Sequence, residues 1–168
     1  MVYPNYQSVE DIDIRSFFED KWGRSLDPSK GLTVVEIMNR IVSGQMFGMY
    51  VMGENPAMSD PDQNHARTAL SKLQHLVVQD IFFTETAWFA DVIFPASAQP
   101  EKAGTYTNSN RQVQIGFPVR KAPGDAEQDW KLIVDLANRC RLNWNYTNIS
   151  SVYKEMASTM TSLNNISW

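Results

Sequence analysis

The chain has 168 residues, of which 43% are hydrophobic and 20% charged, and its net charge at pH 7 is −4. This composition is typical of one folded globular domain and excludes an intrinsically disordered chain. The lysines and arginines are scattered, and no run of about 18 apolar residues could span a bilayer, so we expect neither nucleic acid nor membrane as a partner. The start of the chain lacks the basic and apolar regions of a signal peptide, which predicts a cytoplasmic protein.

The first part of the chain carries two helical patterns. Spaced apolar side chains over residues 9–22 predict a short helix that Gly23 ends. A loop rich in glycine, proline and serine follows. Thr33 is a suitable N-cap, Glu36 completes a capping box, and the apolar face after them predicts a second helix that ends at Gly44.

Short apolar runs then alternate with helical patterns. Two runs are predicted as buried strands, over residues 47–52 and 75–80, and a third run, residues 91–94, is predicted as a strand that Pro95 stops. Helices are predicted between them over residues 64–73 and 84–90. Strands that are apolar on both faces and alternate with helices indicate a parallel sheet covered by helices on both sides.

The pattern changes after the third strand. In residues 104–116 a polar turn is flanked by residues that favour strands, which predicts a β-hairpin. Apolar residues at helical spacing predict further helices over residues 125–139 and 150–160.

Together these elements predict an α/β fold, a three-layer α/β/α Rossmann-like domain with a mainly parallel sheet plus a β-hairpin. We expect one domain over residues 1–168, in which residues 1–30 and 150–168 are peripheral extensions. Ligands of such sheets bind at the carboxyl ends of the strands, where the loops gather.

Three loops that follow the predicted strands carry side chains suited to a nucleotide. Gly53 lets the backbone approach a ligand and Asn55 offers a donor and an acceptor, although an ordinary turn explains the same loop. Asp80 can accept hydrogen bonds from a ribose diol or from guanine, or it can cap the next helix. Lys102 can reach a phosphate, or it can be solvated. The residues alone therefore indicate a nucleotide-like pocket without either of the familiar glycine-rich phosphate motifs.

The cysteine and histidine content of the chain does not indicate a metal site. Cys140 is the only cysteine, so the chain can form no internal disulfide. His65 and His75 have no cysteine or close carboxylate partner in the sequence, whereas a zinc site needs several ligands at short spacing. We therefore predict no metal-binding residues.

Five segments carry a family resemblance when they are taken in order. They are MGENPAMSDPD from Met52, VVQDIF from Val77, TETA from Thr84, ADVIFPA from Ala90 and EKAGTYTN from Glu101. With the later Gln128-Asp129-Trp130 they resemble part of the formate dehydrogenase major subunit, within the molybdopterin oxidoreductases that include dimethyl sulfoxide reductases. The resemblance covers most of the chain and is weakest at its two ends.

The resemblance implies a cofactor-binding segment. Enzymes of that family hold molybdenum or tungsten between two molybdopterin guanine dinucleotides, and equivalents of several residues here contact one dinucleotide. The implied cofactor-binding residues are Gly53, Glu54, Asn55, Gln79, Asp80, Thr84, Lys102 and Asp129. For Asp129 an interaction with the dipole of the following helix is the alternative.

The resemblance also implies what the segment lacks. The catalytic cysteine or selenocysteine, its histidine neighbour and the iron–sulfur cysteines of the family lie upstream of this region, so we expect no catalytic residue and no turnover by the isolated chain. Relatives have arginine where this chain has Phe117 and Glu127, which would weaken attraction to a polyphosphate if both positions face it.

The resemblance implies that this segment binds the cofactor of a parent enzyme, and that the parent enzyme oxidises formate to carbon dioxide. The segment's partners would be the remaining domains of the parent subunit, and exposed apolar surface predicts self-association. Two alternatives remain open: a stand-alone nucleotide-binding module that acts without molybdenum, and a remnant that folds and binds nothing.

Overall fold

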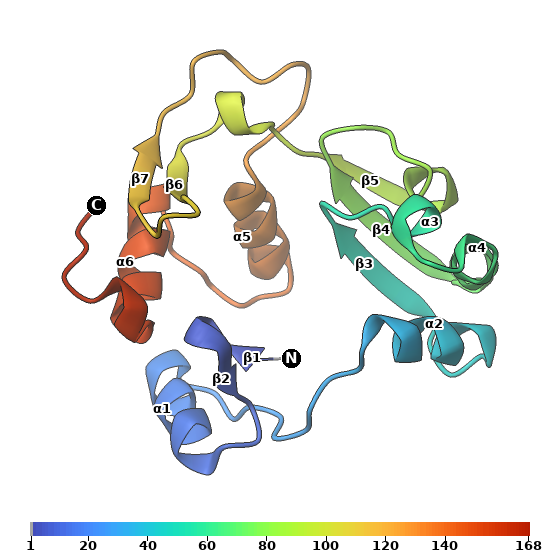
Figure 1. Cartoon of the computed structure of the whole chain (residues 1–168), viewed down its shortest axis with the longest axis horizontal. Helices are drawn as coiled ribbons and strands as arrows, with labels where there is room; N and C mark the ends of the chain where they lie inside the picture. Colours follow the sequence, from blue (N-terminus) through green and yellow to red (C-terminus); the bar gives the residue numbers. More distant parts are fainter. Residues whose placement is uncertain (1) are drawn as a thin grey trace. The chain divides into compact units, whose positions relative to one another are not determined.

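The computed structural model describes residues 2–168, which form two compact units (Figure 1). One unit combines the residues up to Val34 with Ser150–Trp168, and the other spans Val35–Ile149. No helix among residues 2–168 is long and apolar enough to cross a membrane.

The terminal unit is built from short elements around an aromatic core. Its elements are β1 (Val2–Tyr3), η1 (Pro4–Tyr6), β2 (Gln7–Ser8), α1 (Ile12–Trp22), most of α6 (Ile149–Thr159) and η4 (Thr161–Leu163). The predicted first and last helices are confirmed. Helix α1 begins where Asp11 accepts hydrogen bonds from two first-turn N–H groups, and it ends at Gly23, whose φ is 63°. Phe18 is fully buried and stacks on Tyr3 with ring centroids 4.6 Å apart.

A parallel sheet organises the central unit. Its first elements are α2 (Val34–Val42), β3 (Gly48–Met52), α3 (Pro56–Ser59), α4 (Gln63–Lys72), β4 (His75–Asp80), η2 (Ala87–Phe89) and β5 (Val92–Pro95). The three strands lie in the order β3-β4-β5, and both neighbouring pairs are parallel. The α/β class with a parallel sheet is confirmed, as are the predicted helices that became α2 and α4.

The core lies between one face of this sheet and its helices. Val51, Leu76 and Val78 from the strands pack with residues of α3, α4 and η2. A second cluster joins Met38 and Ile41 of α2 to two buried alanines of α4. Burying an aliphatic side chain of this size contributes roughly 1.5–3 kcal/mol, so these two clusters hold α2 and α4 on the same side of the strands.

The other face of the sheet is more open. Tyr50 and Met52 of β3 are 39% and 48% exposed, and Val92 of β5 is 37% exposed. The prediction that β3 is a buried strand was therefore wrong, because only Val51 of its five residues is buried. The physical reason is that α2 and α4 pack on the opposite face, while Figure 1 shows α5 (Asp129–Arg139) on this side, away from most of the strands.

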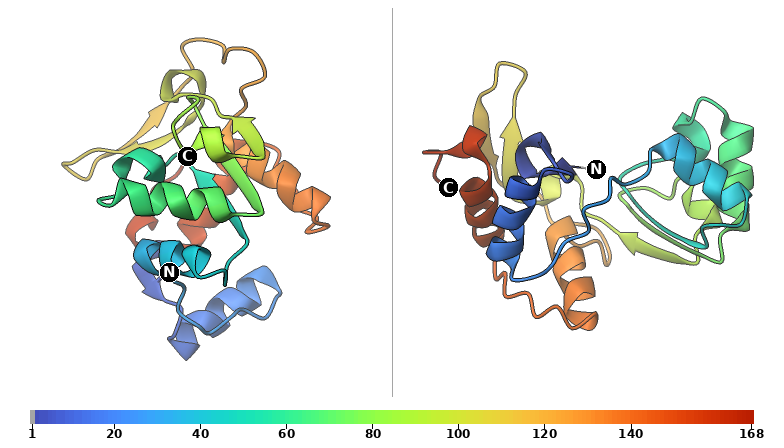
Figure 2. Two further views of the ribbon diagram at one scale, coloured as in Figure 1. Left: turned by 90° about the vertical axis from the view of Figure 1, so that its right-hand side faces the viewer. Right: turned by 90° about the horizontal axis from the view of Figure 1, so that it is seen from below.

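The hairpin is confirmed and stands apart from the parallel sheet (Figure 2). It follows η3 (Gln99–Glu101) and pairs β6 (Gly104–Thr107) with β7 (Val113–Gly116) in antiparallel register. Arg111, in the turn between the strands, has a φ of 68°.

Three boundaries differ from the prediction. The segment expected to be helical over residues 84–90 forms only the short 3₁₀ helix η2, and the loop after β3 contains the single turn α3. Helix α5 begins at Asp129 rather than at residue 125, because Glu127 extends the sheet. Its N–H donates to the Pro95 carbonyl at 3.1 Å, and its carbonyl accepts from the Ser97 N–H at 2.9 Å.

Candidate functional site

The carboxyl ends of β3 and β4 form an open sheet edge. Gly53 has a φ of 64°, and its N–H donates to the Gln79 carbonyl at 2.9 Å, so the chain turns one residue after β3. A Cβ atom at Gly53 would have no neighbour within 4 Å. The turn therefore requires a left-handed backbone conformation and leaves free space beside it, as a ligand-binding turn needs.

Asn55 ties this turn to the loop after β4. Its Oδ1 accepts from the backbone N–H of Thr86 at 3.1 Å and from the Thr86 hydroxyl at 2.7 Å. Its Nδ2 donates to Glu85 Oε2 at 2.7 Å, and this hydrogen bond lowers the pKa of Glu85. The Thr86 oxygen in turn accepts from the Ala57 N–H at 3.1 Å. Both ends of the Asn55 amide are thus used inside the protein.

A second network joins Gln79, Lys102 and Asp129. Gln79 is fully buried and donates through Nε2 to Asp129 Oδ1 at 2.8 Å. The other carboxylate oxygen of Asp129 forms an ion pair with the Lys102 ammonium. Tyr50 donates its hydroxyl to Gln79 Oε1. Three predicted residues from distant parts of the sequence therefore meet, and Tyr50, which no sequence motif indicated, completes the network.

The network fixes the charge of its members. Burial acts to raise the pKa of Asp129, but hydrogen bonds from Lys102 and Gln79 and the positive charge of Lys102 outweigh burial and lower it overall. Burial, together with the negative charge of Asp129, raises the pKa of Tyr50. At neutral pH the site therefore holds a carboxylate and a protonated phenol.

Asp80 stands at the end of β4 and is partly exposed. Its Oδ1 accepts from the N–H of Ile81 at 2.7 Å. It caps no helix, since η2 begins only at Ala87 with Thr86 at its N-cap position, so that alternative is excluded. Among residues 2–168 no donor reaches the second carboxylate oxygen of Asp80, which leaves an acceptor at the strand end.

The remaining predicted residues lie outside both networks. Glu54 is exposed beside Gly53. The Thr84 hydroxyl accepts weakly from the Ala87 N–H at 3.4 Å and so helps to start η2. Within the described part of the chain, no group of three or more histidine, cysteine or carboxylate side chains could hold a metal ion.

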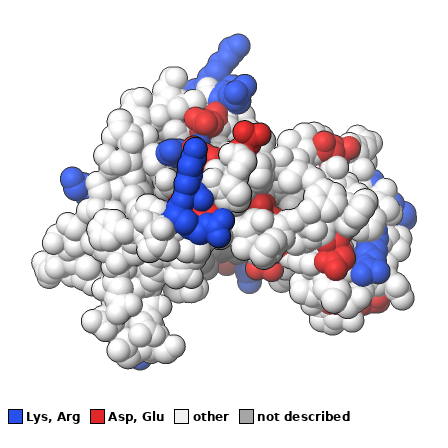
Figure 3. All heavy atoms as spheres, turned by 90° about the horizontal axis from the view of Figure 1, so that it is seen from above, with Lys and Arg blue, Asp and Glu red and all other residues white. Residues whose placement is uncertain are grey.

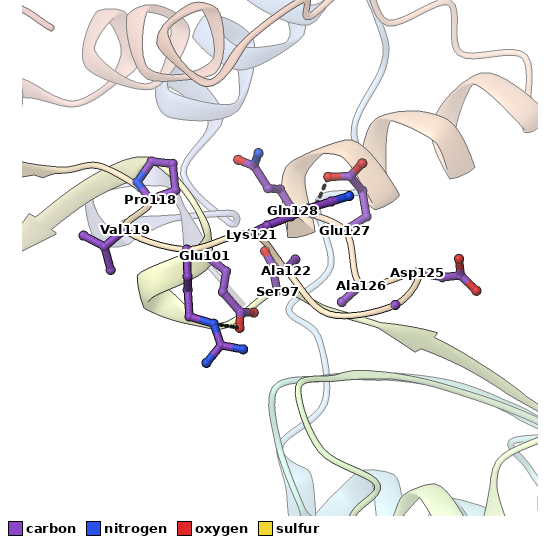
Figure 4. A pocket seen from close by; sticks show the side chains of 12 residues that line it. Ser97, Glu101, Pro118, Val119, Lys121, Ala122, Asp125, Ala126, Glu127 and Gln128 are labelled. Carbon is purple, nitrogen blue, oxygen red and sulfur yellow. Dashed lines mark hydrogen bonds and ion pairs between the residues drawn. The ribbon is translucent and has the colours of Figure 1, made fainter.

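A pocket of about 680 Å³ lies next to these groups, between the segment after β5 and the start of α5 (Figure 4). Its lining includes Ser97, Glu101, Arg120, Lys121, Asp125, Glu127 and Gln128. Glu101 and Gln128 precede Lys102 and Asp129 directly in sequence. No sequence pattern indicated this pocket, because its walls come from segments far apart in the sequence.

Comparison with known proteins finds a matching family model and similar sequences. The family model Molybdopterin oxidoreductase matches residues 22–139. The chain is 44% identical over 160 residues to a formate dehydrogenase alpha subunit of Methanocaldococcus jannaschii, covering 92% of this chain and 23% of the relative. It is 42% identical over 155 residues to a provisionally named formate dehydrogenase of Bacillus subtilis, of which it spans 16%. The chain thus spans less than a quarter of either relative.

A solved structure shares the fold. Acetylene hydratase from Pelobacter acetylenicus superposes with a TM-score of 0.65 over 99% of this chain and 24% of its own, at 18% sequence identity.

Proposed function

Because this chain belongs to the molybdopterin oxidoreductase family, we propose that it binds the guanine-nucleotide end of a molybdopterin guanine dinucleotide as part of a formate dehydrogenase. The parent enzyme would oxidise formate to carbon dioxide, as the names of the two similar relatives suggest. The remaining domains of that parent subunit are the proposed partners.

One observation carries the proposal: the open carboxyl edge of the parallel sheet, where Gly53 and Asp80 lie at neighbouring strand ends. The free space beside Gly53 and the unused carboxylate oxygen of Asp80 fit a nucleotide that lies along this edge. The Lys102 ammonium suits a phosphate. The residues present therefore fit the nucleotide end of the cofactor.

Each residue has a distinct proposed task. Asp80 accepts hydrogen bonds from the N1–H and N2–H edge of guanine. Lys102 donates its remaining N–H groups to phosphate, and Asp129 with Gln79 holds that lysine in place. Asn55 holds the two loops together and so shapes the space beside Gly53.

Chemistry and binding are divided in this proposal. When bound, the molybdopterin supplies the oxidation–reduction chemistry, with molybdenum or tungsten. The residues of this chain bind and orient its nucleotide end. The isolated chain is expected to show no formate-dependent turnover.

Titration with GDP tests the proposal. GDP that binds only the folded protein stabilises it by RT ln(1 + c/Kd), where c is the GDP concentration, which is about 2.7 kcal/mol at a hundred times the Kd. We expect GDP to raise Tm, ADP to do so less because adenine lacks the N1–H donor, and Asp80→Ala to abolish the difference. Asp135→Ala, an exposed carboxylate of α5, is the matched control. Equal shifts with GDP and ADP in the unmodified chain would contradict guanine binding.

A further inference from the structure

The pocket beside α5 contains a buried hydroxyl without a partner. Ser97 is fully buried, and its Oγ has no hydrogen-bond partner among the described residues. Its backbone is held in place, since its N–H donates to the Glu127 carbonyl at 2.9 Å. Buried polar groups are nearly always satisfied, so an unpaired hydroxyl that lines a pocket points to a ligand that pairs with it.

The acidic groups of the pocket already have partners. Glu101 has a side chain only 7% exposed; it accepts from the Ala98 N–H at 2.8 Å and pairs with Arg120 at 3.3 Å. Glu127 accepts from the Gln128 N–H at 2.8 Å and from Lys131 at 3.2 Å. These two carboxylates therefore add no unbalanced negative charge to the pocket.

The third acid, Asp125, is exposed. Figure 4 shows its carboxylate directed away from Ser97, Ala122 and Gln128. It therefore lies at the outer edge of the pocket rather than among the groups that would face a ligand.

Donors, in contrast, remain unused. Lys121 forms no ion pair with any residue from 2 to 168, and the same residues offer no acceptor to the Gln128 amide nitrogen. Gln128 is the N-cap residue of the 11-residue helix α5, and it makes no capping hydrogen bond. The positive end of the α5 dipole therefore faces the pocket, and Asp129 in its first turn is neutralised by Lys102.

The surrounding surface carries basic groups. Figure 3 views the face on which the loop between β7 and α5 lies, and lysine and arginine side chains gather there beside acidic ones. Arg120 uses only its Nε in the pair with Glu101, so its terminal nitrogens remain available at the pocket.

We propose that this pocket binds a phosphoryl group, with Ser97, Lys121 and Gln128 as its ligands. The Ser97 hydroxyl and the Gln128 amide donate hydrogen bonds to phosphate oxygens, and Lys121 supplies charge. The pocket adjoins the proposed guanine site, because the Asp80 carbonyl accepts from the Ala96 N–H at 2.9 Å, one residue before Ser97. This inference rests on the proposed nucleotide function, and it assigns that function three residues that are not among the cofactor-binding residues implied by the resemblance.

Inorganic phosphate and GMP, titrated separately at constant ionic strength, test the pocket by thermal unfolding. We expect Ser97→Ala and Lys121→Gln each to weaken phosphate binding by about tenfold or more, as the loss of one charge-assisted hydrogen bond predicts. Lys30→Gln, which removes an exposed loop lysine of the terminal unit, should leave binding unchanged. Stabilisation by GMP alone, lost in both pocket variants, would identify the nucleotide as the phosphate source and also support the site.

The ligand-free variants separate binding from structure. Since the Ser97 hydroxyl has no internal partner, Ser97→Ala should unfold at the same temperature as the unmodified chain or higher. A lower Tm without ligand, unchanged phosphate and GMP shifts in both pocket variants, or no shift with either ligand in the unmodified chain would overturn the proposal. If guanine preference depends on Asp80 while the pocket variants bind normally, only this inference fails. If the pocket variants lose phosphate but no guanine preference exists, only the guanine assignment fails.

Discussion

Asn55 suits a ligand by its chemistry but is used inside the protein. Its amide oxygen accepts from the Thr86 backbone and hydroxyl, and its amide nitrogen donates to Glu85. Thr86 is fully buried, so no water could replace these bonds without entering the core. The resemblance implies that Asn55 contacts the cofactor. In the structure the Asn55 side chain instead holds two loops together.

Asn55→Ala tests that role. The change leaves the Thr86 N–H and hydroxyl without their acceptor, and each unsatisfied buried group costs about 1–3 kcal/mol. We expect the free energy of unfolding in urea to fall by at least this amount. Glu54→Ala, at the exposed neighbouring position, should change it by less than about 0.5 kcal/mol. Equal stability of the two variants would contradict the role.

The carboxylate of Asp129 predicts a pH dependence. Its pKa is lowered in the folded protein relative to the unfolded value of about 3.9. Its contribution to stability is therefore fully present above the unfolded pKa and is lost as the pH falls through the folded pKa. Unfolding free energies measured from neutral to acidic pH should therefore fall more steeply below about pH 4 for the unmodified chain than for Asp129→Asn. Parallel pH profiles would show that the carboxylate is not stabilised by Lys102 and Gln79.

At the scale of elements, the ends of the strands decide the site. The turn after β3 needs a left-handed residue, and Gly53 provides it. The start of α5 is set by Glu127, whose backbone pairs beside β5 and so brings Asp129 to Gln79 and Lys102. The turn at Gly53 and the pairing of Glu127 therefore bring the loop after β3, the end of β4 and the start of α5 to one edge of the sheet.

Gly53→Ala measures the cost of that turn. A Cβ atom would meet nothing within 4 Å, so the whole effect comes from the backbone conformation, which costs an L-residue about 1–2 kcal/mol. We expect the free energy of unfolding to fall by that amount. Gly104→Ala, in strand β6 with no positive φ, is the control and should be neutral or slightly stabilising. A neutral Gly53→Ala would mean that the turn adopts another conformation.

Elements were predictable where side-chain patterns repeat. Strand β4 has the predicted bounds, and the hairpin and α2 are close to theirs. A short apolar run marks β4, a polar turn marks the hairpin, and helically spaced apolar residues mark α2. The start of α5 was missed because the pairing of Glu127 uses only backbone groups. Likewise η2 is shorter than predicted, since Thr86 and Asn55 bond to each other across two loops.

At the scale of the whole molecule, apolar side chains are exposed on the loop after β4. Phe82 is 73% exposed, Phe83 59% and Trp88 75%, and the rings of Phe83 and Trp88 contact each other at 4.9 Å. A group of exposed apolar side chains is typical of a surface that another protein or domain covers. It agrees with a chain that spans only 16% to 23% of its relatives.

This loop predicts self-association of the isolated chain. Sedimentation at increasing concentration should show dimers or larger species, and the double substitution Phe82→Ser with Trp88→Ser should reduce them, because it removes apolar area that association would bury. Tyr6→Ser, at a residue 90% exposed in the terminal unit, is the control and should not change association. A monomer at every concentration would contradict the prediction.

The sequence by itself determined the α/β class, the parallel strands, the hairpin and the family, because these depend on local periodicity and on motifs that can be seen in order along the chain. The tertiary structure alone decided which polar residues are free to meet a ligand. Asp80 keeps an unused acceptor, whereas Asn55, Gln79 and Asp129 bond to residues 27 to 50 positions away in sequence. The pocket at Ser97 also emerged only from the fold, since hydrogen bonds between distant segments leave no pattern in the sequence.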